Sequence, residues 1–201
     1  MKRPQKVKGS IPTKDVELVL AAGGIKGYGH IGALKELIRF GITFSVVTGV
    51  SVGSVIAAFL TNGYTPEQIL EIFENSVGQR YSLKKVLRLL SKVPDPLQVM
   101  LGGWMNLYPA VRDMVEEYDL KPNSRLRLVA CDLFGHRPVP FEWTDDQFET
   151  DAEAYDAIAF AIASSCSLPP IFQPQKHNGR YLIDGALWNH NPVDFHLFRY
   201  F

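Results

Sequence analysis

One serine lies in a sequence motif whose residue types and spacing suit acyl chemistry. The motif is Gly49-Val-Ser-Val-Gly53, a G-x-S-x-G pattern in which small residues flank Ser51. Where this motif joins a strand to a helix, a sharp turn exposes the serine hydroxyl, and the amino end of the helix favours negative charge nearby. We therefore predict that Ser51 is a nucleophile and that Gly49 and Gly53 form its elbow. The alternative is an ordinary strand–helix turn with no catalytic role.

A glycine loop, Ala22-Gly-Gly-Ile-Lys-Gly27, precedes this motif. Such loops bind phosphate in nucleotide sites, but neither G-x-x-x-x-G-K-[ST] nor an intact G-x-G-x-x-G is present, because Ala22 stands at the first glycine position. We expect an oxyanion hole instead, formed by backbone amides aimed at a tetrahedral intermediate. The amides expected to form it are those of Gly23, Gly24 and Ile25. Lys26 either fixes the shape of this loop or is a solvated surface residue, and Gly27 completes the loop.

A carboxylate near the end of the chain is the third candidate group. Asp184 follows the short apolar stretch 181–183. Asp-Gly is a common turn dipeptide, but a carboxylate at the carboxyl end of a strand also reaches the rim of the sheet where the serine turn is expected. Asn191 precedes Pro192, and its amide is placed to hold the Asp184 loop, although Asn-Pro is also a routine turn.

Strands and helices alternate in the order needed to bring these groups together. Apolar runs predict strands at 16–21, 44–48, 125–131 and 181–183. Helices are predicted at 30–40, 54–60 and 154–163, and one more begins at Thr65, where Gln68 can complete a capping box. This rhythm is typical of a parallel α/β sheet, whose sites lie at the carboxyl ends of its strands.

The segment 81–108 differs from the rest of the chain. Basic residues alternate with leucine and valine in its first half, and methionine, tryptophan and leucine follow in its second. One interpretation is a helical excursion packed on the sheet. The other is a lid or membrane-touching surface, because basic residues beside leucine and tryptophan suit an anionic bilayer interface.

The bulk composition indicates one catalytic domain over residues 15–201 after a loose leader at 1–14. Lysine plus arginine and aspartate plus glutamate balance at 21 each, which argues against nucleic acid as a partner. No signal peptide or membrane-spanning run is recognisable, so the expected location is cytoplasmic and peripheral to a membrane. Cys131 and Cys166 are expected to be small core residues in a reducing compartment.

Four stretches together resemble the patatin-like phospholipase family. They are the glycine loop, the G-x-S-x-G motif, Ala163-Ser-Ser-Cys-Ser-Leu-Pro-Pro170 and Asp184-Gly-Ala-Leu-Trp-Asn-His-Asn-Pro192, in the family's order. The resemblance implies a three-layer α/β/α fold with a mostly parallel central sheet. It also implies a serine lipid acyl hydrolase in which Ser51 is the nucleophile and Asp184 the base.

The reaction implied by the resemblance is cleavage of fatty acyl esters of phospholipids or lysophospholipids through an acyl-enzyme. An aspartate with an ordinary pKa near 4 is a weak base, so we expect burial to raise the pKa of Asp184. No metal or other cofactor is expected. Two alternatives stay open: a transacylase that uses the same acyl-enzyme, and a catalytically idle lipid-binding protein.

A Ser-Asp-His triad of the α/β-hydrolase type is a further alternative, because His190 and His196 follow Asp184. In that fold several strands normally precede the serine turn, whereas only two are expected here. A triad would also need a carboxylate such as Asp132 as its third member. His30 is expected to hydrogen-bond the glycine loop or to cap the following helix.

Two features depart from the family pattern. Ala22 is tolerable at the first glycine position unless the backbone there needs a positive φ. The chain also ends at Phe201, soon after the Asp184 stretch, whereas family members usually continue through further helices. We therefore expect either a compact member or one shortened at its carboxyl end.

Overall fold

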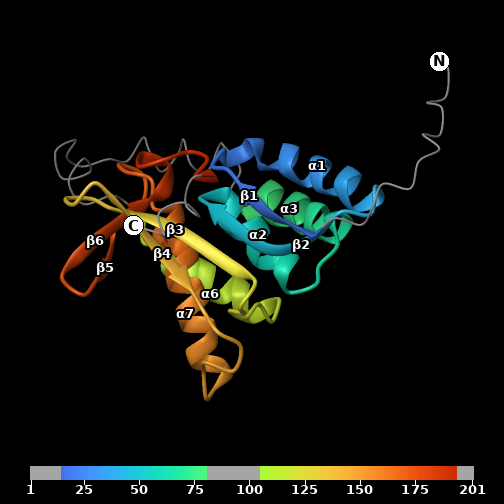
Figure 1. Ribbon diagram of the computed structural model, residues 1–201. Coiled ribbons are helices and arrows are strands. Elements are labelled where there is room, and N and C mark those ends of the chain that lie inside the picture. Colours follow the sequence, from blue (N-terminus) through green and yellow to red (C-terminus); the bar gives the residue numbers. More distant parts are fainter. Residues whose placement is uncertain (1–14, 81–104, 194–201) are drawn as a thin grey trace.

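The computed structural model describes residues 15–80 and 105–193, which fold around one mixed sheet of six strands (Figure 1). The order in space is β1-β2-β3-β6-β5, with β4 paired to β3. The strands are β1 (Asp15–Leu20), β2 (Thr43–Val50), β3 (Leu126–Asp132), β4 (Arg137–Glu142), β5 (Gln175–His177) and β6 (Arg180–Asp184). The neighbours β1, β2 and β3 are parallel, and the other pairings are antiparallel. This architecture confirms the predicted α/β class.

Helices lie between successive strands. In chain order they are α1 (Gly27–Arg39), α2 (Val52–Thr61), α3 (Pro66–Arg80), α6 (Tyr108–Glu117) and α7 (Asp151–Cys166). The helices α1, α2, α3 and α6 connect the parallel strands, and α7 connects β4 to β5. The predicted start of α3 is confirmed, because the Thr65 amide donates to Gln68 Oε1 and the Gln68 amide donates to Thr65 Oγ1. Thr150 and Glu153 form the same kind of box at the start of α7, which the sequence reading missed.

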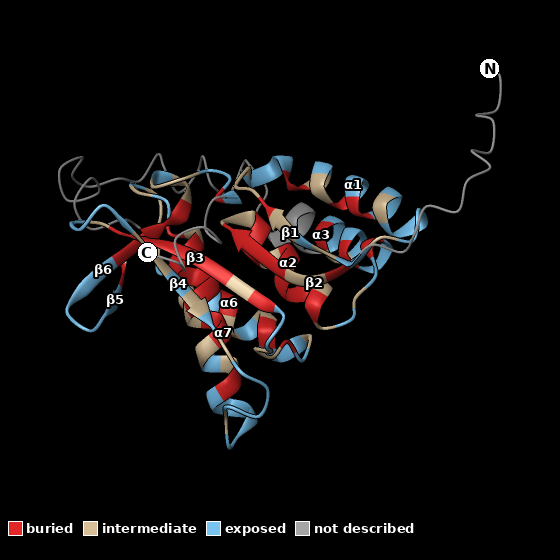
Figure 2. Cartoon of the chain, viewed as in Figure 1, coloured by how far each residue is buried: buried red, intermediate tan, exposed pale blue. Residues whose placement is uncertain are grey.

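One hydrophobic core joins these helices to the sheet. Val47 lies opposite Leu18 on one side and Leu126 on the other; Val47 and Leu126 belong to this core, and the partly buried Leu18 packs against it. Side chains of α1, α2, α3, α6 and α7 pack into the same cluster. In Figure 2, β2 and β3 are mostly buried, whereas the loop joining β5 to β6 is exposed. The buried centre of the sheet is therefore the pair β2 and β3, and β2 leads directly into the serine turn.

Strand β3 has a different neighbour at each end of one edge. β4 pairs with β3 over Arg127–Asp132 and occupies one edge throughout. On the other edge, β2 pairs with Leu126–Val129, and β6 pairs with Ala130–Asp132. The carboxyl ends of β2 and β6 therefore meet head to head along β3. This junction positions the candidate site.

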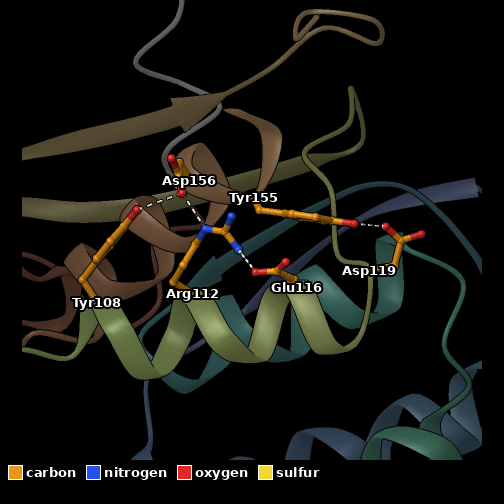
Figure 3. Close-up of polar contacts among 6 residues, drawn as sticks. All are labelled: Tyr108, Arg112, Glu116, Asp119, Tyr155 and Asp156. Atoms are coloured by element: carbon orange, nitrogen blue, oxygen red, sulfur yellow. Dashed lines mark hydrogen bonds and ion pairs between the residues drawn. The ribbon is translucent and has the colours of Figure 1, made fainter. Parts of the chain in front are cut away.

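Polar contacts fasten α6 to α7 on the outside of the core (Figure 3). Arg112 donates its Nε to Asp156 Oδ1 across 2.5 Å, and Tyr108 Oη donates to the same oxygen across 3.1 Å. Tyr155 Oη donates to Asp119, which lies just beyond α6. Because α7 ends at the candidate site, this network holds the helix that carries part of the site.

Several predictions fall on parts of the chain that the structure does not describe. The leader at 1–14 and most of the segment 81–108 lie outside the described residues. At the end of that segment, Met105 forms an isolated bridge with Phe172. Cys131 and Cys166 are free, as predicted. Among the described helices, none has the length and apolar character needed to cross a bilayer.

Candidate active site

Ser51 lies between β2 and α2 in the turn that its motif predicts. Its backbone has φ 54° and ψ −126°, a combination that non-glycine residues rarely adopt. Holding such a conformation costs of order 1–3 kcal/mol, which the surrounding structure must supply. The turn places the serine at the amino end of α2, one residue before the helix begins.

The two glycines of the elbow are required by close backbone contacts. A β-carbon on Gly49 would lie 2.5 Å from the Gly53 carbonyl oxygen. A β-carbon on Gly53 would lie 2.1 Å from the Leu20 carbonyl oxygen at the end of β1. Real side chains do not occupy such positions, so any larger residue forces the backbone apart.

Asp184 is the side chain that meets the serine hydroxyl. Ser51 Oγ donates a hydrogen bond to Asp184 Oδ2 across 2.7 Å, and the Ala186 amide donates to Oδ1 across 2.9 Å. Asp184 is only 2% exposed, and burial raises the pKa of its carboxyl group. The pKa of Asp184 is lowered in turn by the hydrogen bonds from Ser51 and Ala186 and by the nearby His190.

The path by which Asp184 reaches the serine differs from our expectation. We expected a carboxyl-terminal strand end at the common rim of parallel strands, but β6 runs antiparallel to β3. Val129 pairs with Val50, the residue before Ser51, and the next residue, Ala130, pairs with Asp184. Ser51 and Asp184 therefore come together because β2 and β6 pair with the same edge of β3.

Two buried serines that the sequence reading did not assign hold the backbone of Ser51. The Ser51 amide donates to Ser165 Oγ across 2.9 Å, and that hydroxyl donates to the Val129 carbonyl across 2.7 Å. Ser54 binds the Ser51 carbonyl through its amide at 2.8 Å and its hydroxyl at 2.5 Å. Ser165 belongs to the 163–170 stretch, but nothing in its local pattern indicates this contact.

The glycine loop lies beside the elbow. Gly24 has φ +52° and opens a 3-10 helix over Gly24–Lys26, whereas Gly23 is extended at φ 179°. A β-carbon on Gly27 would lie 2.6 Å from Val52, the residue that follows Ser51, so the loop packs on the start of α2. The amides of Gly23, Gly24 and Ile25 thus belong to a loop in contact with the elbow, while Lys26 is exposed.

Ala22 is compatible with this loop. It is absent from the described non-glycine residues with positive φ, so a methyl group is tolerated. Its amide donates to the His190 carbonyl across 3.0 Å, and His30 Nε2 lies 2.9 Å from the Ala21 carbonyl oxygen. The hydrogen bond expected from His30 to the glycine loop therefore goes to the residue just before that loop.

We expected the side chain of Asn191 to hold the loop after Asp184, but the contacts within this loop are made by Asn189. Asn189 Oδ1 accepts from the Asn191 amide across 3.0 Å, and the Asn189 amide donates to the Gly185 carbonyl. Asn191 itself is exposed and contributes its backbone to the loop, accepting from Val193.

The carboxylate that a triad would need is engaged elsewhere. Asp132 Oδ1 accepts from the amides of Phe134 and Gly135, and its Oδ2 lies 3.5 Å from Arg137 Nε. These contacts fix the turn between β3 and β4. His196 lies outside the described residues.

The fold and site together define an α/β protein with a serine on a strained strand–helix elbow and a buried aspartate bonded to its hydroxyl. Residues 18–196 match the family model of the patatin-like phospholipases. The chain therefore belongs to the patatin-like phospholipase family.

Relatives of this chain come from bacteria, a virus, a fungus and animals. It is 26% identical to "Uncharacterized protein YqhO" of Bacillus subtilis, covering 89% of this chain and 65% of that protein. It is 28% identical to "Probable lipid hydrolase 463L" of Invertebrate iridescent virus 6, covering 88% of this chain and 61% of that protein. "Lysophospholipase NTE1" of Candida albicans is also 28% identical, and the match covers 89% of this chain and 12% of that protein. The chain thus spans less than two thirds of the length of these relatives.

A solved structure shares the fold. VipD from Legionella pneumophila superposes with a TM-score of 0.50 at 16% identity, covering 88% of this chain and 46% of that chain. The described sheet and helices are consistent with the three-layer α/β/α arrangement expected for this fold.

Proposed function

We propose that this chain is a serine lipid acyl hydrolase that cleaves fatty acyl esters of phospholipids or lysophospholipids through a Ser51–Asp184 dyad. The observation that carries the proposal is the 2.7 Å hydrogen bond from Ser51 Oγ to the buried Asp184 carboxylate. Family membership and the names of two relatives, a probable lipid hydrolase and a lysophospholipase, support the same substrate class.

The proposed reaction begins when Asp184 Oδ2 accepts the proton of Ser51 as Oγ attacks the acyl carbonyl. The carbonyl π bond breaks and its oxygen carries the negative charge, which the amides of Gly23, Gly24 and Ile25 stabilise. Protonated Asp184 then gives its proton to the leaving alcohol as the ester C–O bond breaks. Water repeats both steps on the acyl-enzyme and releases the fatty acid.

The environment of Asp184 supports its role as a base. Burial raises the pKa of this carboxyl group above the ordinary value for aspartate, which makes it a better proton acceptor. The Ala186 amide holds the other oxygen, so the carboxylate keeps its orientation toward Ser51. The dyad needs no histidine for proton transfer.

Apolar side chains on the segments of the site support action at a lipid surface. Ile25 of the glycine loop is 78% exposed, and Leu187 and Val193 of the loop after Asp184 are about half exposed. Leu168, just past α7, is also exposed. Exposed apolar side chains of this kind can mark contact surfaces. We therefore propose that the protein works at a membrane surface, from the cytoplasmic side expected above.

A fluorophosphonate probe together with a phospholipid panel tests this proposal. Wild-type protein is expected to be labelled at Ser51 and to release fatty acids detectable by mass spectrometry, whereas Ser51→Ala should do neither. Absence of labelling in a folded wild-type protein would favour the idle lipid-binding alternative. Labelling with acyl transfer to an added alcohol in place of fatty acid release would favour the transacylase.

A further inference from the structure

We infer that the end of α7 sets the geometry of the Ser51–Asp184 pair, and that the Ser165 hydroxyl is the positioning group for Ser51. The inference rests on the proposed function, because it concerns the same site. Ser165 touches neither reacting atom in the dyad, so its role is to hold the residue that does.

The position of Ser165 follows from a gap in the sheet. The ladder between β2 and β3 ends at the pair Val50 and Val129, and β6 takes over the edge of β3 at Ala130. The Ser51 amide therefore falls just beyond the last β2–β3 pair. Ser165 Oγ fills this place, accepting from the Ser51 amide at 2.9 Å and donating to the Val129 carbonyl at 2.7 Å. The Ser165 hydroxyl thus links α7 to β3 and to the turn that follows β2.

Ser51, whose amide Ser165 binds, is also the residue with the strained backbone. Ser51 has a positive φ, and without restraint its backbone favours other conformations that move Oγ away. Ser54 restrains the carbonyl of Ser51, and Ser165 restrains its amide. Ser165 is fully buried, so loss of its hydroxyl leaves the Ser51 amide without this partner.

The same segment also holds the other half of the dyad. The Asp184 amide donates to the Ser167 carbonyl across 2.9 Å, and Ser167 Oγ donates back to Ala163 of α7 across 2.7 Å. Two residues that are two positions apart at the end of one helix thus bind Ser51 and Asp184. Their spacing along the chain fixes the separation of nucleophile and base.

A matched control lies next to Ser165. Ser164 is the same residue type, is equally buried, and has a hydroxyl with no hydrogen-bond partner among the described residues. Ser164→Ala therefore removes a buried hydroxyl from the same helix turn without removing a contact to Ser51. Ser165→Cys keeps a weaker donor and acceptor at the critical position.

The decisive experiment compares Ser165→Ala, Ser165→Cys and Ser164→Ala in ester hydrolysis, normalised to folded protein. Ser165→Ala is expected to lower kcat about 10- to 100-fold with little change in KM, because small misplacement of a reacting group costs this much. Ser165→Cys should fall between Ser165→Ala and wild type, and it also serves if the alanine variant fails to fold. Ser164→Ala should match wild type.

The pH profile separates positioning from simple loss of stability. The bond from Ser51 lowers the pKa of Asp184, so weakening that bond should move the acid limb of kcat/KM to higher pH in Ser165→Ala. Among the residues that the structure describes, the other titratable groups that interact with Asp184 are His190, Cys131 and Cys166, and neither Ser165→Ala nor Ser164→Ala changes them. Ser164→Ala should leave the limb in place.

Amide hydrogen exchange gives a readout that does not need turnover. The Ser51 amide should exchange faster in Ser165→Ala than in Ser164→Ala or wild type. Equal kcat, equal pH profile and equal exchange in the two alanine variants would overturn the inference. If wild-type protein does not hydrolyse any lipid, the proposed function fails, and with it the effect of Ser165 on turnover. Exchange then decides only whether Ser165 holds Ser51.

Discussion

The carbonyl oxygen of Leu20 and the α-carbon of Gly53 approach so closely that a β-carbon on Gly53 would lie 2.1 Å from that oxygen. This contact joins the end of β1 to the start of α2 and leaves no space for a side chain. The elbow therefore depends on Gly53 for packing as much as for its turn.

Gly53→Ala should lower the free energy of unfolding by about 3 kcal/mol, because the methyl group must displace backbone. Gly32→Ala is the control: this glycine lies in α1 with open space at its β-carbon, so alanine should raise stability by up to about 1 kcal/mol. Urea denaturation measures both changes. Equal stability of the two variants would show that the close contact is not rigid.

The Arg112–Asp156 contact between α6 and α7 should contribute measurably to stability. The Arg112 side chain is 20% exposed and also meets Glu116 within α6. A double-mutant cycle with Arg112→Met and Asp156→Asn should give a coupling free energy of about 0.5–1 kcal/mol that weakens in high salt. The corresponding cycle with Glu116→Gln should give less, because that pair lies within one helix. Zero coupling for Asp156 would mean that this ion pair does not help to hold the two helices together.

Asp184 should make the protein less stable as the pH rises. Because burial raises its native pKa, the folded state retains the proton over a range in which the unfolded state loses it. The stability that this group contributes is complete below the ordinary pKa of aspartate and is lost as the pH rises through the raised native pKa. Asp184→Asn does not titrate, so its advantage in melting temperature over wild type should grow across that range.

Asp132 is the opposite case and provides the control. Its pKa is lowered, first by the Gly135 amide and then by Phe134 and Arg137. Asp132 should therefore stabilise the protein above the ordinary pKa of aspartate, and Asp132→Asn should lose stability there. Melting curves from pH 3 to 8 that show the same trend for both variants would contradict these assignments.

The predictable part of the fold was its parallel half. The apolar run before the glycine loop and the run before Gly49 specify two strands, and helical periodicity specifies α1 and α2. Short βαβ connections then leave little choice of arrangement. The serine elbow follows because its motif requires the strand–helix turn that those runs flank.

The antiparallel half was not predictable from local pattern. Pro138 and Pro140 lie within β4, which tolerates them because among the described strands it pairs only with β3. The stretch before Asp184 reads equally well as a parallel or an antiparallel strand. Ser165 lies in a helix that indicates only burial, so its contact with Ser51 depends on tertiary structure.

Chelation should not affect turnover, because the proposed chemistry uses Ser51, Asp184 and backbone amides alone. Hydrolysis measured before and after EDTA treatment should agree within error. Loss of activity in EDTA that calcium restores would contradict a metal-free mechanism.

The assignment of Asp184 as the base is tested most directly by turnover of Asp184→Asn beside His190→Ala. Asparagine keeps the shape of the side chain but cannot accept the proton, so kcat should fall by about 10²- to 10⁴-fold. His190 contributes its backbone carbonyl to Ala22 and weak electrostatics to Asp184, so its alanine variant should keep most of the activity. If His190→Ala is as inactive as Ser51→Ala while Asp184→Asn still turns over, histidine is the base and the dyad is wrong.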